Sequence, residues 1–184
     1  FVVKNDYFHH EVGKKLAKTH FDVGYSNESG VRELVENAGS LMGEIELDAE
    51  RQVMNSFLSE LIKSAPRATY GEMMVRSALE RGAIDKLLIS EGLRKNTITL
   101  QCGSCKHEWT ATIGRMEALP ACPSCEASGD NAKELNSVSL IDELGKMAER
   151  SNTEIVYISI DTEEGSQLLH GFGGLAALCR YPMM

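Results

Sequence analysis

Four cysteines are the residues of this chain whose type and spacing suggest chemistry. They form two pairs, Cys102 with Cys105 and Cys122 with Cys125, and sixteen residues lie between the pairs. Two residues between cysteines let both thiolates of a pair turn toward one point, and the spacer brings the second pair opposite the first. Four thiolates placed in this way coordinate zinc tetrahedrally. Because all four ligands come from the protein, such a metal has no open position for water and is expected to be structural.

Neighbouring residues fit this interpretation. Gly103 is expected to help the first pair turn, because glycine takes up positive φ without steric cost. Pro123 stiffens the second pair, and the run from 107 to 113 is expected to supply a ribbon strand. The alternatives are disulfides, free core thiols, a redox dithiol, which needs one such pair rather than two, and an iron site of the rubredoxin type.

The composition indicates a folded globule. The chain has 184 residues, of which 42% are hydrophobic, enough for one ordinary domain plus a small one. It has no apolar run near the roughly eighteen residues of a membrane span, and no signal-peptide pattern at its start. Five cysteines with four assigned to a metal fit a reducing cytoplasm, and Cys179 is expected to be a buried, inert thiol. The chain begins at Phe1 rather than methionine, which suggests a fragment of something longer.

The charge balance argues against nucleic-acid binding that is independent of sequence. The formal net charge is −8, whereas such binding needs many lysines and arginines to neutralise phosphates. The cysteine-containing segment, 97–136, is itself more acidic than basic, and four thiolates around one divalent cation add further negative charge. A direct nucleic-acid partner is therefore not expected.

The first third of the chain is predicted to be helical. An amphipathic helix is expected over 7–18, with His9 and His10 exposed near its start. Ser26 is expected to cap a second helix that ends at Gly39, and Asp48 a third that stops before Pro66.

The rest of the chain alternates strands with helices on either side of the cysteine segment. Strands are expected over 67–70, 84–90, 154–160 and 175–181, and helices over 72–81, from 139 to about 152, and after Asp161 or Thr162. Ser139 with Asp142 is similar to a capping box. This order predicts a small mixed or parallel sheet with helices on both faces. We therefore expect an α/β domain formed by 1–96 and 137–184, interrupted by a zinc-ribbon mini-domain at 97–136.

Motifs for catalysis are missing from the sequence. The glycines from Gly171 to Gly174 precede a strand, whereas phosphate loops open a helix. No nucleophile–histidine set is indicated, the carboxylates do not single out an acid–base pair, and His170 stands alone beside the glycines. The sequence favours a binding module over an enzyme.

Three stretches carry a resemblance to a known family. The run 164–181 contains an EGxQ pattern, then Gly171-Phe172-Gly173-Gly174, then a strand ending in Arg180-Tyr181. The segment from Phe21 to Gly30 and the ALERGA run at 78–83 are further matches. Together they resemble the third domain of archaeal and eukaryotic class I peptide chain release factors. The paired cysteines favour the archaeal branch, and the paralogous ribosome-rescue factor, pelota, is the alternative.

This resemblance implies a three-layer α/β/α sandwich of the L30e-like type with a protruding zinc mini-domain. In the full family, other domains read the stop codon and present a Gly-Gly-Gln loop that triggers peptidyl-tRNA hydrolysis. The third domain docks onto an elongation-factor-type translational GTPase and later onto an ABC-type recycling ATPase, on the ribosome. This sequence has neither Gly-Gly-Gln nor the codon-reading Asn-Ile-Lys-Ser, so the chain is expected to hydrolyse nothing.

The resemblance also implies a partner-binding set at the C-terminal motif: Gly171, Phe172, Gly173, Gly174, Arg180 and Tyr181. The same glycines could instead let a helix pack close to a core strand, and both interpretations stay open at this point. Phe172, Leu175 and Leu178 are expected to be mainly core. Arg180 is the better contact candidate, so its loss is expected to weaken partner binding without lowering the melting temperature.

Overall fold

A computed structural model describes residues 21–182. Within this range, residues 40–42 and 44–46 are described by their backbone but not by their side chains. The predicted helix over 7–18, with His9 and His10, lies outside the described residues. The chain divides into two units, one ending at Glu46 and one beginning at Leu47. Within the described part, no helix is both long and apolar enough to cross a membrane.

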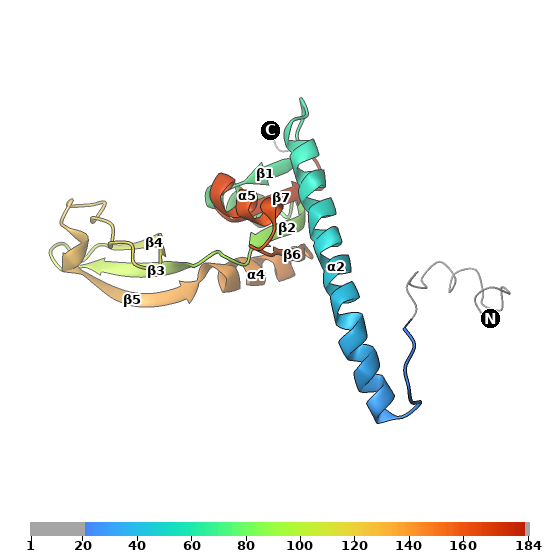
Figure 1. Cartoon of the computed structure of the whole chain (residues 1–184). Coiled ribbons are helices and arrows are strands. Elements are labelled where there is room, and N and C mark those ends of the chain that lie inside the picture. Colours follow the sequence, from blue (N-terminus) through green and yellow to red (C-terminus); the bar gives the residue numbers. More distant parts are fainter. Residues whose placement is uncertain (1–20, 183–184) are drawn as a thin grey trace. The chain divides into compact units, whose positions relative to one another are not determined.

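One continuous helix, α2 (Glu28–Leu61), replaces the two helices that the sequence predicts (Figure 1). Asn27 rather than Ser26 caps its first turn, because the Asn27 side-chain oxygen accepts hydrogen bonds from the amides of Ser29 and Gly30. Gly39 does not end the helix. An internal glycine costs a helix only about 1 kcal/mol, which the other residues of a 34-residue helix can offset.

The second unit contains two sheets. The first has the order β1-β7-β2-β6, in which β2 and β6 are parallel and the other pairs antiparallel. This confirms the predicted mixed α/β fold. The elements around this sheet are β1 (Ala68–Tyr70), α3 (Glu72–Glu80), β2 (Ile84–Ser90), α4 (Leu140–Arg150), β6 (Glu154–Ile158), α5 (Glu163–Gly171) and β7 (Leu175–Cys179).

Side-chain alternation along the strands divides the core between the two faces of this sheet. Leu87 and Ile89 of β2 point to one face, where they pack with α3 and α4. Leu88, between them, points to the other face and packs with Phe57 of α2 and Leu168 of α5. Because strand side chains alternate, the continuous apolar run of β2 marks a strand that is covered on both faces.

The second sheet is antiparallel, in the order β4-β3-β5. Its strands are β3 (Lys95–Cys102), β4 (Glu108–Gly114) and β5 (Ala132–Ser139), with the short 3₁₀ helix η1 (Gly129–Asn131) before β5. The sequence predicts only β4. In β3, Ile98, Leu100 and Cys102 are buried and their neighbours are not, so this sheet has a core on one face.

The structure contradicts one predicted helix cap and decides between the two residues predicted for another. Ser139 stands at the start of α4 but makes no side-chain capping bond, so the expected capping box with Asp142 does not form. Thr162 rather than Asp161 caps α5, with its hydroxyl oxygen accepting from the amide of Gly165 at 3.0 Å.

Candidate metal site and partner surface

Two similar turns hold the four cysteines. Cys102 ends β3, and its amide donates to His107 while its carbonyl accepts from Lys106. In the second turn, the amide of Cys122 donates to Ala127 and its carbonyl accepts from Glu126. Each turn thus uses the same two backbone hydrogen bonds. Such rigid turns fix where the thiols point.

The predicted role of Gly103 needs correction. The residues with positive φ in these turns are Lys106 (62°) and Glu126 (58°), each directly after the second cysteine of its pair. Gly103 is required for space instead, because a Cβ there would lie 2.6 Å from the carbonyl oxygen of Asn131. That carbonyl accepts from the Gly103 amide at 2.8 Å, and the Asn131 side chain donates to Ser104 at 2.7 Å. Sequence reasoning missed Asn131, which no motif marks.

The sulfur atoms form a compact cluster. Cys102 and Cys125 have their sulfurs 3.5 Å apart, those of Cys105 and Cys122 are 3.6 Å apart, and all four lie within 4.8 Å of one another. A tetrahedron with zinc–sulfur bonds of about 2.3 Å has sulfur–sulfur edges of about 3.8 Å. A disulfide would need about 2.05 Å. The geometry therefore suits a single tetrahedral ion and none of the possible disulfides.

The electrostatics of the cluster favour a cation. The amides of Cys105 and Ser104 donate toward the sulfur of Cys102, and they lower the pKa of that thiol to about 6. The pKa of Cys125 is raised to about 12: the Ala127 amide lowers it, but the adjacent sulfurs of Cys105 and Cys102 outweigh that effect. One thiolate thus forms readily, and its charge disfavours deprotonation of a second thiol. A divalent ion would offset this repulsion and favour the deprotonated forms.

The glycine motif closes the end of α5. Gly173 (φ 71°) and Gly174 (φ 80°) adopt left-handed conformations, and the Gly174 amide donates to the carbonyl of Leu168. Phe172 is half-buried as expected, and its ring lies edge-on to those of Phe57 at 5.2 Å and Tyr70 at 5.1 Å. Phe172 therefore has a packing role, and Gly173 and Gly174 a backbone role, whether or not they bind a partner.

Arg180 is bound to the protein's own backbone. Its guanidinium donates to the carbonyls of Ser151 at 3.1 Å and Asn152 at 2.8 Å, just past α4, and to Gly82 at 3.3 Å. A cation there also complements the negative end of the helix dipole. The expectation that Arg180 serves contact rather than stability therefore needs revision, because its side chain joins three chain segments.

The six predicted partner-binding residues are separated in two groups. The strand β7 lies between Gly174 and Arg180, and a five-residue strand spans about 17 Å. Phe172 has an exposed apolar neighbour, Tyr70, that the sequence did not single out. Tyr70 touches Phe172, and Met73 and Met74 follow it in the first turn of α3, with Met73 82% exposed.

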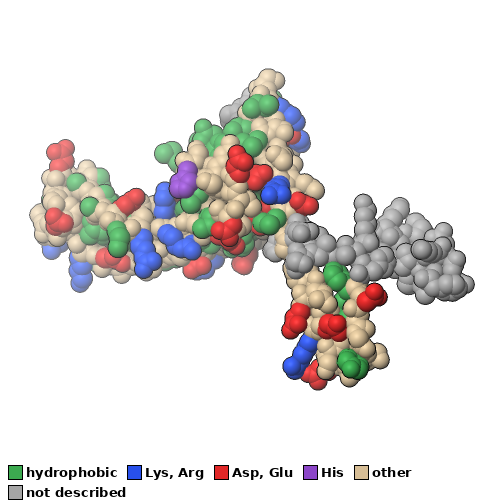
Figure 2. Space-filling model, viewed as in Figure 1, with side chains coloured by type: hydrophobic (Ala, Val, Ile, Leu, Met, Phe, Trp, Pro, Cys, Tyr) green, Lys and Arg blue, Asp and Glu red, His purple; other side chains and the backbone are tan. Residues whose placement is uncertain are grey.

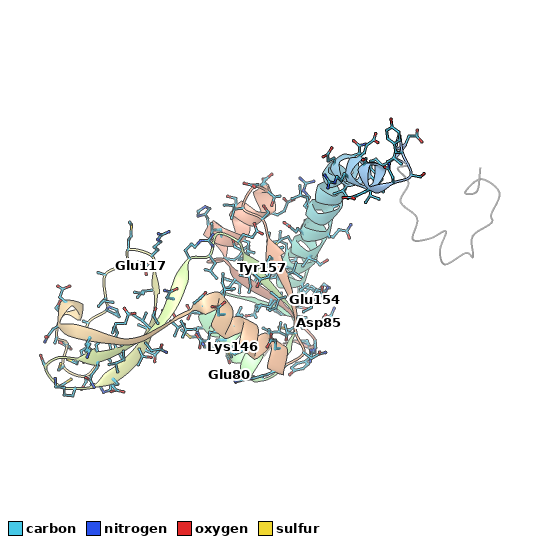
Figure 3. The ribbon with its side chains drawn as sticks, turned by 90° about the horizontal axis from the view of Figure 1, so that it is seen from below. Glu80, Asp85, Glu117, Lys146, Glu154 and Tyr157 are labelled. Atoms are coloured by element: carbon cyan, nitrogen blue, oxygen red, sulfur yellow. The ribbon has the colours of Figure 1, made fainter. Side chains whose placement is uncertain are left out.

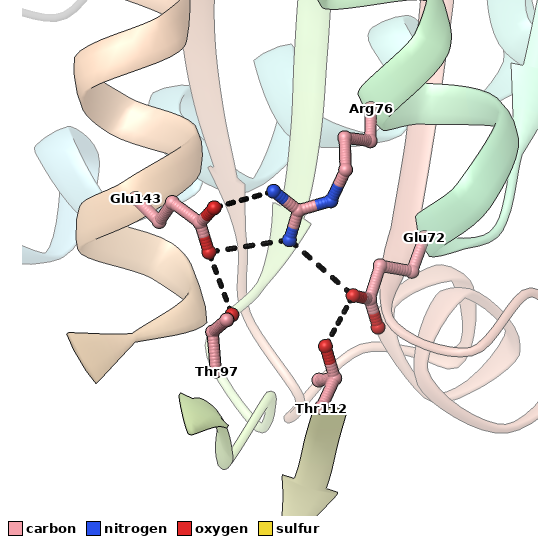
Figure 4. A network of polar contacts seen from close by, with 5 residues as sticks. All are labelled: Glu72, Arg76, Thr97, Thr112 and Glu143. Carbon is pink, nitrogen blue, oxygen red and sulfur yellow. Dashed lines mark hydrogen bonds and ion pairs between the residues drawn. The ribbon is translucent and has the colours of Figure 1, made fainter. Parts of the chain in front are cut away.

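A polar network joins the cysteine-bearing sheet to the helices (Figure 4). Arg76 of α3 donates to both oxygens of Glu143 in α4 and to Glu72. Each carboxylate also accepts from a threonine of the second sheet, Glu143 from Thr97 of β3 and Glu72 from Thr112 of β4. The sequence gives no sign of this network, since its members are far apart along the chain.

Comparison with known proteins identifies the family. The family described as eRF1 domain 3 matches residues 47–183. The chain belongs to this family. The match begins where the second unit begins, and it includes both sheets of this eRF1 domain 3 protein.

Several relatives of the eRF1 domain 3 chain are archaeal. "Peptide chain release factor subunit 1" of Thermococcus kodakarensis is 42% identical over 97% of this chain and 44% of the relative. The chain thus spans less than half the length of the curated relatives it matches. A solved C-terminal domain of the peptide chain release factor from Methanosarcina mazei is 37% identical, with a TM-score of 0.68 over 86% of this chain and 98% of that one. A structure of ribosome-bound archaeal Pelota and ABCE1 matches at 19% identity and a TM-score of 0.58, over 100% of this chain and 42% of that one, which shows the fold alone.

Proposed function

We propose that this chain is the non-catalytic docking domain of a translation termination factor of the archaeal type. In the full-length factor, other domains recognise stop codons and trigger peptidyl-tRNA hydrolysis, and this domain binds an elongation-factor-type translational GTPase. The 42% identity to an archaeal release factor subunit carries the proposal. The absence of a Gly-Gly-Gln loop from the 184 residues supports a role without catalysis.

The four cysteines are proposed to hold one structural zinc ion. The sulfur cluster fits a tetrahedral ion, and four protein ligands leave no position for a reacting water. We assign the cysteine-bearing segment, predicted as 97–136, to a zinc mini-domain inserted into an L30e-like α/β/α sandwich. An iron site of the rubredoxin type is the alternative for the same ligands. A visible absorption band would identify iron, whereas a colourless protein with one zinc per chain supports the proposal.

The GTPase is proposed to dock around Gly171–Gly174. Support comes from the exposed ring of Tyr70, which contacts Phe172, and from Met73 and Met74, two exposed side chains that follow Tyr70 in the sequence at the start of α3, since exposed apolar patches mark interaction sites. An ABC-type ATPase is proposed as a second partner on the ribosome, by analogy with the named components of the Pelota and ABCE1 complex. We place the protein in the cytoplasm and expect no direct contact with a specific nucleic-acid sequence.

The test is a calorimetric titration of this chain with an archaeal elongation-factor-type GTPase loaded with a GTP analogue. We expect saturable one-to-one binding that Met73→Glu weakens. Tyr157→Glu is the matched control, because Tyr157 is exposed on β6, at the opposite edge of the sheet from β1 (Figure 3). Equal GTPase binding by Met73→Glu and Tyr157→Glu would contradict the proposed docking surface. Binding to the GTPase partner of pelota in preference to that of the release factor would favour the rescue-factor alternative.

A further inference from the structure

A groove lies where the connection between the two sheets meets the start of α4. Its volume is about 450 Å³. One wall is the segment from β2 into β3, and the other is the end of β4 with the turn that follows it. The lining residues used below are Leu93, Arg94, Lys95, Ile113, Arg115 and Met116.

Three cations line this groove, and no carboxylate does. None of Arg94, Lys95 and Arg115 takes part in the ion pairs found in the described part of the chain. Arg94 uses one nitrogen on the carbonyls of Glu91 and Leu93, which leaves its charge uncompensated. In a chain with a formal charge of −8, this is a local reversal of sign. Figure 2 shows Lys and Arg side chains gathered where the two sheets meet.

The same groove has an apolar component. Leu93 is buried at its base, and Ile113 and Ile141 are half-buried in its walls. Met116 stands at the rim with its side chain 100% exposed and its backbone at φ 81°. A flexible thioether side chain held fully in water is suited to covering an apolar group of a ligand.

Backbone and side-chain contacts hold both walls in place. The Arg115 amide donates to the Arg94 carbonyl at 3.2 Å and so joins the two walls directly. Glu117, the nearest acid in the turn, accepts from the Gly114 amide at 2.7 Å. The Thr97–Glu143 and Thr112–Glu72 bonds attach β3 and β4 to the helices. A groove formed before binding lowers the entropic cost of association.

We propose that this groove binds a short acidic segment of a partner protein, with a large apolar side chain seated between Leu93, Ile113 and Met116. Arg94, Lys95 and Arg115 would pair with the acidic side chains around it. A single-stranded nucleic acid fits less well, because its bases stack on aromatic rings and the lining has none. The proposal is independent of the GTPase assignment.

The test uses a short fluorescein-labelled peptide in which leucines alternate with pairs of glutamates, followed by fluorescence anisotropy. We expect saturable binding that Lys95→Glu together with Arg115→Glu weakens about tenfold at moderate salt. Lys133→Glu together with Lys146→Glu is the control of equal charge change, since Lys133 on β5 and Lys146 on α4 (Figure 3) are exposed and lie outside the groove lining. Amide shifts in a ¹⁵N spectrum should concentrate at 93–96, 113–116 and 139–141. The same spectra verify that each variant is folded.

Two further probes distinguish an acidic peptide with apolar side chains from other ligands of the groove. A peptide with serine in place of leucine should bind distinctly more weakly, and equal binding would overturn the apolar part of the proposal. A fluorescein-labelled oligouridine of similar length should bind less tightly than the peptide. Tighter oligouridine binding that the double variant abolishes would overturn the proposal in favour of nucleic acid. Equal loss of peptide binding in the Lys133→Glu/Lys146→Glu control and in the Lys95→Glu/Arg115→Glu variant would show attraction by general charge alone and would overturn the proposal.

Discussion

The hydroxyl of Thr97 in β3 lies 2.6 Å from a carboxylate oxygen of Glu143 in α4, the same carboxylate that Arg76 of α3 holds. One guanidinium thus fixes a carboxylate that in turn fixes a strand of the second sheet. Glu72 and Thr112 repeat the arrangement on the other side of Arg76 (Figure 4). The two threonine contacts between the cysteine-bearing sheet and the helices therefore share one cation.

Replacing Arg76 should destabilise the protein markedly. Arg76→Met leaves Glu72 and Glu143 without their shared partner, and we expect a loss of about 1–3 kcal/mol in the free energy of unfolding. Urea denaturation at neutral pH measures it. Arg81→Met is the control, since Arg81 is exposed and takes no part in the ion pairs among the described residues. A change in Arg76→Met no larger than in the control would contradict the proposed role.

Acidification should remove the contribution of Glu143. Hydrogen bonding to Arg76 holds the pKa of this carboxyl below its ordinary value, with the Thr97 hydroxyl acting in the same direction. A lowered folded pKa means that the stabilisation is present above the unfolded value, about 4.3, and is lost as the pH falls through the folded pKa. The difference in the free energy of unfolding between the native chain and Glu143→Gln, measured by urea denaturation, should therefore become smaller from pH 7 to pH 3. A constant difference would contradict this.

Metal removal should unfold the second sheet and spare the first. Ile98 and Leu100 are buried in the second sheet but belong to neither core of the first one. Trp109, the single tryptophan of the chain, lies in β4, so its fluorescence reports on this sheet alone. Chelation should shift that fluorescence while the thermal transition seen by far-ultraviolet circular dichroism persists. Loss of both together would show that the two sheets melt as one.

Removing the Arg180 side chain should lower stability as well as any partner affinity. Arg180→Ala leaves the carbonyls of Ser151, Asn152 and Gly82 without a charged donor, and we expect a cost of about 1–2 kcal/mol. Tyr181→Ala, at an exposed neighbour, should stay within about 0.5 kcal/mol. Thermal denaturation of Arg180→Ala and Tyr181→Ala measures both effects. Equal melting temperatures would show that Arg180 has no structural role and serves only to contact a partner.

Gly165 should tolerate no side chain. A Cβ at this position would lie 1.7 Å from the carbonyl oxygen of Ser159, so Gly165→Ala must displace the start of α5, at a cost of about 3 kcal/mol or more. Gly171→Ala provides the comparison in the same helix, because its nearest contact would be an ordinary 3.8 Å to Gln167. Near-equal melting temperatures for the two variants would refute the steric explanation of the EGxQ glycine.

Apolar patterning made most of the first sheet predictable. The continuous run of β2 and the helices beside it lie within a residue or two of their predicted bounds. By contrast, β5 has an exposed, largely polar sequence that gives no strand signal, because it is an edge strand stabilised by pairing with β3. The alternation of Ile98 and Leu100 in β3 was a readable signal that the prediction overlooked.

The candidate sites divide in the same way. The cysteine cluster follows from local spacing, because each pair needs only one turn. Neither the carbonyls around Arg180 nor the groove beside Arg115 could be predicted, since both depend on segments brought together by the fold. The glycine motif is visible in the sequence, but the left-handed conformations of Gly173 and Gly174 and their separation from Arg180 could be found only in the structure.

The chain enters the second sheet and leaves it at neighbouring positions. Asn96 of β3 is the register partner of Ser139 of β5, so the chain leaves the first sheet and returns to it at points about 5 Å apart. A tight turn could therefore replace the whole excursion without rerouting β2 or α4. The segment from 96 to 139 is therefore topologically an insertion, because its removal or replacement would leave the strand order of the first sheet unchanged.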